Sequence, residues 1–250
     1  MTYCVAISVN EGMVLCSDSR TNAGVDQIST YSKMFRYELG PDRQFVVMTA
    51  GNLATTQATM AQLKKDIRQK ALMNLTNVMT IGDAADYIGD ISVTQQDKHG
   101  GSSRSSFHAT FLLGGQIGDS EHRIVMIYPE GNHITSSKDT PYLQIGESKY
   151  GKPILDRILS LETTLDTAAL SALVSMDSTM RSNLSVGPPI ELVLYRAGSF
   201  SLESYYRFED DSEYLRELKK SWDNRLKEAF HKLPPINLTN SAYKKPEPLV

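Results

Sequence analysis

The sequence predicts an α+β layered fold. Its segments follow the order strands, two helices, strands, two helices, strands. The first predicted strand, residues 3–9, is apolar on both faces, which indicates a sheet that is covered on both sides. Stacked sheets with paired helices outside them satisfy both observations.

The strands are predicted from alternating hydrophobicity between turn residues. Residues 3–9 and 13–17 form a hairpin around the turn Asn10-Glu11-Gly12. A polar loop is expected to follow and to run to about Ser32. The remaining strands are expected at residues 44–49, 108–115, 124–128, 133–136, 191–195 and 204–208.

The helices are predicted where apolar residues recur every three or four positions. The first stripe consists of Leu53, Met60, Leu63, Ile67 and Ala71. A flexible polar loop is expected at 97–106. Further helices are expected at about 83–94, 150–159 and 166–183.

The C-terminal part differs from the rest of the chain. Residues 212–231 carry an apolar stripe opposite a densely charged face, which predicts an amphipathic helix, and an extended tail starts at Leu233-Pro234-Pro235. The stripe needs either a partner surface or the chain's own domain to cover it. We divide the chain into a domain at 1–209 and a C-terminal helix and tail at 210–250.

The composition is that of a soluble globular protein. The chain has 250 residues, 40% hydrophobic and 22% charged, which excludes disordered, collagenous and coiled-coil chains. A net charge of −3 gives no electrostatic case for nucleic acid. The sequence contains neither a membrane-spanning apolar run nor a signal peptide. Cys4 and Cys16 are out of register on the hairpin, so we expect free buried thiols in a reducing cytoplasm.

Several chemistries have no support in the sequence. There is no phosphate-binding loop, and neither the five histidines nor the two cysteines show metal-ligand spacing. We therefore expect no cofactor and no metal. The nearest match to a serine nucleophile elbow, around Ser148, has its second glycine one residue late.

The first strand begins directly after Met1-Thr2. An initiator Met is commonly removed before a small residue, which would leave Thr2 with a hydroxyl and a free α-amine. That amine, with a pKa of about 7.7–8.0, suits a general base near neutral pH. One residue would then supply both nucleophile and base. Since Met-Thr is also a common start, only its context can support this interpretation.

The context is an ordered set of motifs. The return strand ends in Ser17-Asp18-Ser19-Arg20, a loop beginning Thr21-Asn22-Ala23-Gly24 leads to Lys33, and a later strand ends in Thr49-Ala50-Gly51. Over roughly residues 2–195 this set resembles the proteasome β-type subunits, which are N-terminal nucleophile hydrolases. It is most similar to the bacterial Anbu (ancestral β subunit) branch. The resemblance implies a four-layer αββα sandwich, here with an added C-terminal helix and tail.

The resemblance assigns catalytic roles to four residues. Thr2 corresponds to the nucleophile, and Lys33 to a lysine whose ammonium favours the alkoxide and keeps the α-amine unprotonated. Asp18 corresponds to the carboxylate that orients this lysine, and Gly51 to the glycine whose N–H faces the oxyanion. Arg20 corresponds to a structural arginine. Without this context, Asp18 and Lys33 would be a surface ion pair and Gly51 a simple turn.

The shell around the α-amine departs from the family pattern. Glu147, followed by Ser148, stands where proteasome subunits carry a supporting serine, and a glutamate there would raise the pKa of the amine. Ser182 stands where the archaeal and eukaryotic branch carries Asp, while Ser185 matches its serine. The family pattern also implies that Thr21, Asn22 and Thr49 contact the substrate.

Asp177 is predicted independently of the family. On the helix at 166–183 it shares an apolar stripe with Leu170, Leu173 and Met180. A carboxylate on an apolar face needs a partner. It belongs either to the active-site network or to a subunit contact, and we favour the contact.

These observations favour a threonine peptidase in a homo-oligomeric ring or open spiral. It would act in the cytoplasm on peptides or unfolded polypeptides, and only Met1 would have to be removed. Two alternatives keep the fold: an acylase for small amides, and an inactive scaffold subunit. Whether an ATP-driven unfoldase feeds the assembly stays open at this point.

Overall fold

The computed structural model describes residues 1–22, 28–100 and 107–236. The chain separates into two compact units, Met1–Ser212 and Glu213–Val250. None of the helices in these described segments is both long and apolar enough to cross a membrane.

Two five-stranded antiparallel sheets form the centre of the first unit. The first has the order β10-β1-β2-β11-β12, and the second has the order β5-β6-β7-β8-β9. The strands of the first sheet are β10 (Tyr142–Gly146), β1 (Tyr3–Val9), β2 (Gly12–Asp18), β11 (Ile190–Arg196) and β12 (Tyr205–Phe208). Those of the second are β5 (Met34–Glu38), β6 (Arg43–Gly51), β7 (Ala109–Ile117), β8 (Arg123–Ile127) and β9 (His133–Thr135).

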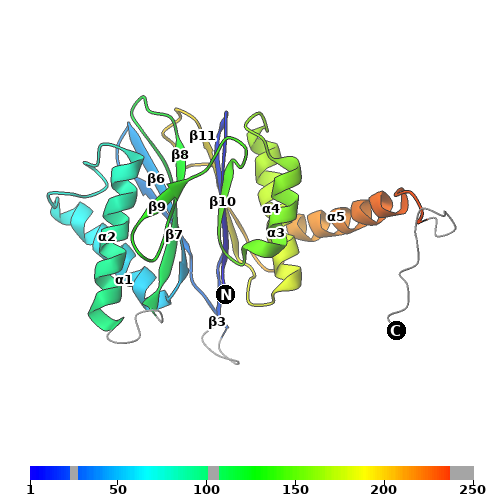
Figure 1. Cartoon of the computed structure of the whole chain (residues 1–250), viewed down its shortest axis with the longest axis horizontal. Coiled ribbons are helices and arrows are strands. Elements are labelled where there is room, and N and C mark those ends of the chain that lie inside the picture. The colour runs from blue at the N-terminus through cyan, green and yellow to red at the C-terminus, as the bar shows by residue number, and fades with distance from the viewer. Residues whose placement is uncertain (23–27, 101–106, 237–250) are drawn as a thin grey trace, which may run out of the picture. The chain divides into compact units, whose positions relative to one another are not determined.

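Two pairs of helices enclose the sheets. Helices α1 (Leu53–Gln69) and α2 (Ile81–Gly100) cover the second sheet, whereas α3 (Ser148–Ile158) and α4 (Leu165–Ser182) cover the first (Figure 1). This arrangement confirms the predicted four-layer αββα sandwich.

The apolar residues form separate cores between these layers. One core lies between the two sheets and includes Cys4, Leu15, Met48, Leu112 and Val193. Another joins the second sheet to α1 and α2. Both faces of β1 and β2 are buried, as the sequence predicts. Both cysteines are free and buried, and Cys4 lies opposite Ser17, also as predicted.

Several elements differ from the sequence prediction. The sequence predicts no element at β5 or β10, and the predicted loop before Ser32 contains the two-stranded pair β3 (Arg20–Asn22) and β4 (Ile28–Thr30). These strands are short, so their alternation is too brief to detect.

Helix boundaries also differ. Helix α1 ends at Gln69, before Ala71, because Lys70 adopts a left-handed cap with φ 51°. Helix α2 continues to Gly100 and overlaps the predicted loop at 97–106, of which 101–106 lie outside the described residues. Tertiary contacts explain the extension, since Gln96 is buried and its side chain donates to the Pro129 carbonyl over 2.8 Å.

The predicted apolar stripe of α4 is correct at Leu173, which is buried, and wrong at Leu170. Leu170 is 44% exposed, and Asp177 lies half-buried at the edge of the buried face. The buried face instead consists largely of small residues that approach the first sheet closely: Ala168, Ala172, Ser175 and Thr179.

The predicted C-terminal helix is present as α5 (Glu213–His231). None of its residues is buried. The greater part of the predicted tail, residues 237–250, lies outside the described residues.

Candidate active site

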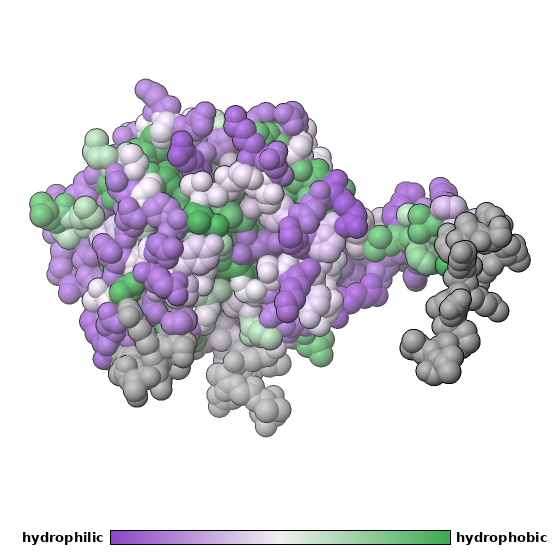
Figure 2. Space-filling model, in the orientation of Figure 1, coloured by the Kyte–Doolittle hydropathy of each residue, from purple (hydrophilic) through white to green (hydrophobic). Residues whose placement is uncertain are grey.

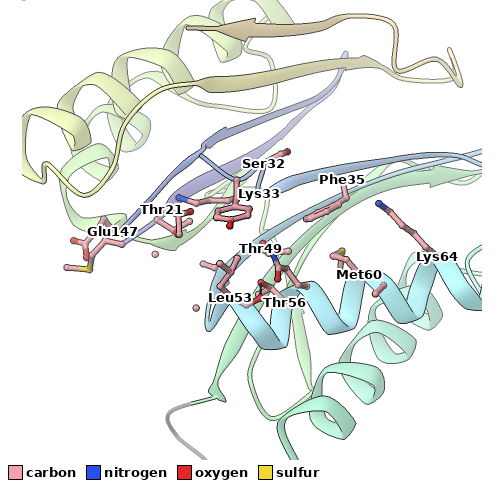
Figure 3. A pocket seen from close by; sticks show the side chains of 18 residues that line it. Thr21, Ser32, Lys33, Phe35, Thr49, Leu53, Thr56, Met60, Lys64 and Glu147 are labelled. Atoms are coloured by element: carbon pink, nitrogen blue, oxygen red, sulfur yellow. Dashed lines mark hydrogen bonds between the residues drawn. The ribbon is translucent and has the colours of Figure 1, made fainter. Parts of the chain in front are cut away.

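The beginning of β1, the end of β6 and one face of α1 meet at a cavity of about 780 Å³ (Figure 3). Thr2, Lys33 and Gly51 all line this cavity. They lie far apart in the sequence and reach one place because the two sheets stack face to face.

A buried ion pair supports the cavity from the side of β2. The Lys33 ammonium donates to Asp18 Oδ1 and to the Arg20 carbonyl, each over 2.7 Å. Asp18 is fully buried and Lys33 is 7% exposed. The backbone N–H groups of Tyr3 and Gly187 donate to Oδ1 and Oδ2 of Asp18 over 3.0 and 3.2 Å. Losing one partner of such a pair costs about 3–5 kcal/mol.

The environment of Asp18 sets its protonation. Burial raises the pKa of the Asp18 carboxyl above its ordinary value. The Lys33 charge and the three hydrogen bonds oppose this shift, because they stabilise the ionised form. Asp18 therefore orients the Lys33 side chain through a short hydrogen bond.

The backbone holds Thr2 in place. Its carbonyl accepts a hydrogen bond of 2.8 Å from the Glu147 N–H. Gly146, with φ +81°, packs directly against that carbonyl, and a Cβ there would lie 1.9 Å from the oxygen. The residue before Glu147 must therefore be glycine for Thr2 to occupy this position.

Gly51 occupies a similarly constrained position. It ends β6 with φ +109°, and a Cβ would lie 2.4 Å from the His108 carbonyl oxygen. Directly after it, Asn52 caps α1, and its side chain accepts from the Thr55 N–H over 3.0 Å. Strand end and helix start are thus fixed together at the cavity wall.

The cavity includes three further residues predicted from the sequence. Thr21, Thr49 and Glu147 line it (Figure 3). Asn22 pairs through its backbone with Ile28 across β3 and β4, and its side chain lies outside the part of the chain that the structure describes.

The other predicted site residues do not line the cavity. Arg20 donates to the Leu184 carbonyl over 3.0 Å and packs against Gly187. Ser148 begins α3, Ser182 ends α4 and is exposed, and Ser185 follows in the connection to β11. Asp177 lies within α4, half-buried.

Sequence reasoning missed one side of the cavity. Six residues of α1 line it at helical spacing: Leu53, Thr56, Gln57, Met60, Ala61 and Lys64. Of these, Leu53 and Met60 belong to the apolar stripe predicted for this helix, and the other four lie outside that stripe. Tyr31, Ser32 and Phe35, before and within β5, also line the cavity and carried no sequence signal.

Tyr3 is a second omission. Its side chain is fully buried, and its hydroxyl accepts from the Gln144 side chain over 2.6 Å and lies 3.1 Å from Ser175 Oγ. Burial raises the pKa of the Tyr3 hydroxyl, which keeps it neutral. The residue next to Thr2 is thus anchored at its backbone to Asp18 and at its side chain to β10 and α4.

Metal chemistry has no visible site in the described segments. No group of three or more His, Cys, Asp or Glu residues there could hold a metal ion.

Comparison with known proteins identifies the family. The sequence profile of the proteasome subunit family matches residues 2–194. The chain is a member of the proteasome subunit family. No curated protein sequence is significantly similar to it.

Solved structures place this proteasome-family chain in the Anbu branch. It is 45% identical to Anbu (ancestral beta-subunit) from Yersinia bercovieri, with a TM-score of 0.90, covering 94% of this chain and 99% of that one. It is 41% identical to the chain in the helical assembly of the Anbu complex from Pseudomonas aeruginosa, with a TM-score of 0.89, covering 97% of this chain and 100% of that one. It is 40% identical to Anbu from Hyphomicrobium sp. strain MC1, with a TM-score of 0.87, covering 94% of this chain and 100% of that one. The sequence resemblance and the N-terminal nucleophile hydrolase fold are confirmed.

Proposed function

We propose that this Anbu-family chain is an N-terminal threonine hydrolase that cleaves peptide bonds through an acyl-enzyme on Thr2, after Met1 is removed. One observation carries the proposal. Thr2 lines the same cavity as Lys33, and the ammonium of Lys33 is held by the buried carboxylate of Asp18.

The proposed reaction has two halves. The Thr2 hydroxyl attacks the substrate carbonyl while its α-amine takes the hydroxyl proton. The amine returns this proton to the leaving amine as the peptide C–N bond breaks, which leaves an ester on Thr2. The same amine then takes a proton from water, and hydrolysis of the ester releases the acid and regenerates Thr2.

The other cavity residues support these steps. The Lys33 ammonium stabilises the developing alkoxide, and the Gly51 N–H donates to the oxyanion. The Glu147 carboxylate would raise the pKa of the amine and so keep it a stronger base. Thr21 and Thr49 contact the substrate. Arg20, Ser148, Ser182 and Ser185 lie outside the cavity lining, so any support they give is indirect. Asn22 keeps its proposed role in substrate contact.

Mass spectrometry and one variant test the proposal. We expect the purified protein to lack Met1 and to become covalently labelled at Thr2 by a peptide epoxyketone, which reacts with hydroxyl and amine together. Thr2→Ala should abolish labelling and hydrolysis, whereas Thr2→Ser should retain both. Quantitative retention of Met1, or full hydrolysis by Thr2→Ala, would exclude this mechanism.

The same assays separate the alternatives. A small-amide acylase would hydrolyse N-acyl amides in preference to peptides, and an inactive scaffold subunit would show neither hydrolysis nor labelling. Peptides fit the cavity better, because it continues along α1 well beyond the reacting groups.

We also propose homo-oligomeric assembly, in the cytoplasm, and exposed apolar side chains support the assembly. Helix α5 exposes apolar side chains, including Leu226 and Phe230, and the connection between α1 and α2 exposes Leu72 and Met79, 100% and 80% accessible (Figure 2). Patches of this kind mark contact sites. We propose that residues 210–250 belong to the assembly and that Asp177 lies at a subunit contact, in a ring or open spiral.

A further inference from the structure

The candidate cavity is a groove along α1. Its lining residues on this helix run from Leu53 to Lys64, eleven positions, or about 16 Å along the axis. Glu147 and Thr21 lie at one end and Lys64 at the other (Figure 3). The groove is therefore longer than the space that the reacting groups need.

The wall of this groove is largely apolar, and its far end is cationic. The apolar lining includes Phe35, Ala50, Leu53, Met60 and Ala61, and Thr49, Thr56 and Gln57 add polar groups to it. At the far end the Lys64 ammonium lies 5.6 Å from the centre of the Phe35 ring. Among the described residues, this ring is the partner recorded for Lys64, and no carboxylate lies within ion-pair distance of it.

The remaining charges do not cancel this cation. Lys33 is neutralised by Asp18, and the one carboxylate in the lining, Glu147, is at the Thr2 end. The groove is thus polarised, negative beside Thr2 and positive beyond Met60.

A second cavity of about 380 Å³ shares Ser32, Phe35 and Lys64 with the groove. Its buried carboxylate, Glu191, already accepts hydroxyl hydrogen bonds from Ser19 and Tyr205 over 3.0 and 2.8 Å. Arg36 stacks 4.0 Å above the Tyr205 ring and adds a second cation, while Glu38 is exposed to solvent.

We propose that Lys64 is a specificity-determining residue, which selects peptides with an acidic side chain on the acyl side of the scissile bond. Phe35 and Met60 contact the aliphatic part of the substrate side chain, and Lys64 binds its carboxylate. This inference rests on the proposed peptidase function. Because Lys64 is exposed, the preference should be about two- to fivefold and should weaken with salt.

Binding to the Thr2→Ala protein tests this without turnover. Fluorescence anisotropy would measure labelled peptides that differ at one residue, Glu, Gln or Lys, placed in turn at each of four positions before the scissile bond. At one position we expect Glu to bind about two- to fivefold more tightly than Gln. When Lys64→Glu is added to the Thr2→Ala protein, the peptide with Lys at that position should bind more tightly than the peptide with Glu. Lys65→Glu is the matched control, since Lys65 is exposed and does not line the groove.

Three results would overturn the inference: no binding, equal binding of Glu and Gln at all positions, or the same reversal with Lys65→Glu. Epoxyketone labelling of the protein with intact Thr2 reports separately on the hydrolase. Labelling without Glu preference would overturn the role of Lys64 alone. Lys64-dependent binding without labelling would overturn the hydrolase but keep the binding preference.

Discussion

At the scale of single residues, the Asp18–Lys33 pair shows what burial adds to a motif. The sequence alone fits a surface ion pair, which would contribute little to stability. In the structure the carboxylate has no exposure and has three donors around it. One of those donors is the N–H of Tyr3, so the pair is also tied to the residue that follows Thr2.

Burial of Asp18 leads to a prediction about pH. The raised pKa of Asp18 means that the folded state binds this proton more tightly than the unfolded chain, so ionisation lowers stability as pH rises through the window between the two values. Protonation, conversely, removes the counter-charge of Lys33. We expect the rate of epoxyketone labelling to fall as the pH is lowered. In a plot of the logarithm of this rate against pH, the slope should be about one below the pKa of the Thr2 amine and about two below the pKa of Asp18.

The measurement is the labelling rate at Thr2 against pH, by mass spectrometry. The steeper limb should begin above the ordinary aspartate value of about 3.9. Asp18→Asn should react more slowly and keep a slope of about one throughout. If the second change of slope persists in the Asp18→Asn protein, a titrating group other than Asp18 causes it.

At the scale of elements, α1 begins directly after the end of β6, and one of its faces lines the candidate cavity. Asn52 caps this helix immediately after Gly51, and the helix face that follows lines the cavity. The cap should therefore affect both stability and reactivity.

We expect Asn52→Ala to cost about 1 kcal/mol, lowering the melting temperature by about 2–4 °C, and to slow labelling of Thr2. Thr164→Ala is the matched control, because Thr164 caps α4 in the same way, accepting from the Thr167 N–H over 3.3 Å, and does not line the cavity. It should lower the melting temperature similarly and leave the labelling rate unchanged. Equal slowing by both variants would show that the cap of α1 affects reactivity only through general stability.

Elements with long, regular periodicity were predictable, and those that depend on tertiary pairing were not. The β1–β2 hairpin and α1 follow from local patterns. Strand β10 is recognisable only beside β1, where Gly146 pairs with Tyr3 and makes room for the Thr2 carbonyl. Site residues such as Lys33 were predictable because they belong to an ordered set of motifs. Phe35 and Tyr3 were not, because their place at the site depends on tertiary contacts.

At the scale of the whole molecule, the two units differ in how they are stabilised. Among the described residues, the two hydrophobic cores of the αββα sandwich contain none that follows Tyr205 in the sequence. Helix α5, in contrast, buries none of its side chains. An isolated helix of 19 residues in water is marginal, so we expect a further surface to cover its apolar stripe, and we propose that a partner subunit supplies it.

Removing residues 213–250 should therefore separate folding from assembly. We expect the chain ending at Ser212 to keep a cooperative thermal transition within a few degrees of the full chain, because it retains both cores. In sedimentation velocity it should form smaller species than the full chain. A double substitution in the full chain, Leu226→Glu with Phe230→Glu, should reduce assembly in the same way without shortening it, because it charges the exposed apolar positions of α5. A truncated chain that unfolds would show that the second unit completes the core. A truncated chain that assembles like the full one would place the subunit contacts on the sandwich itself, where the exposed Leu72 and Met79 would be the next surface to charge.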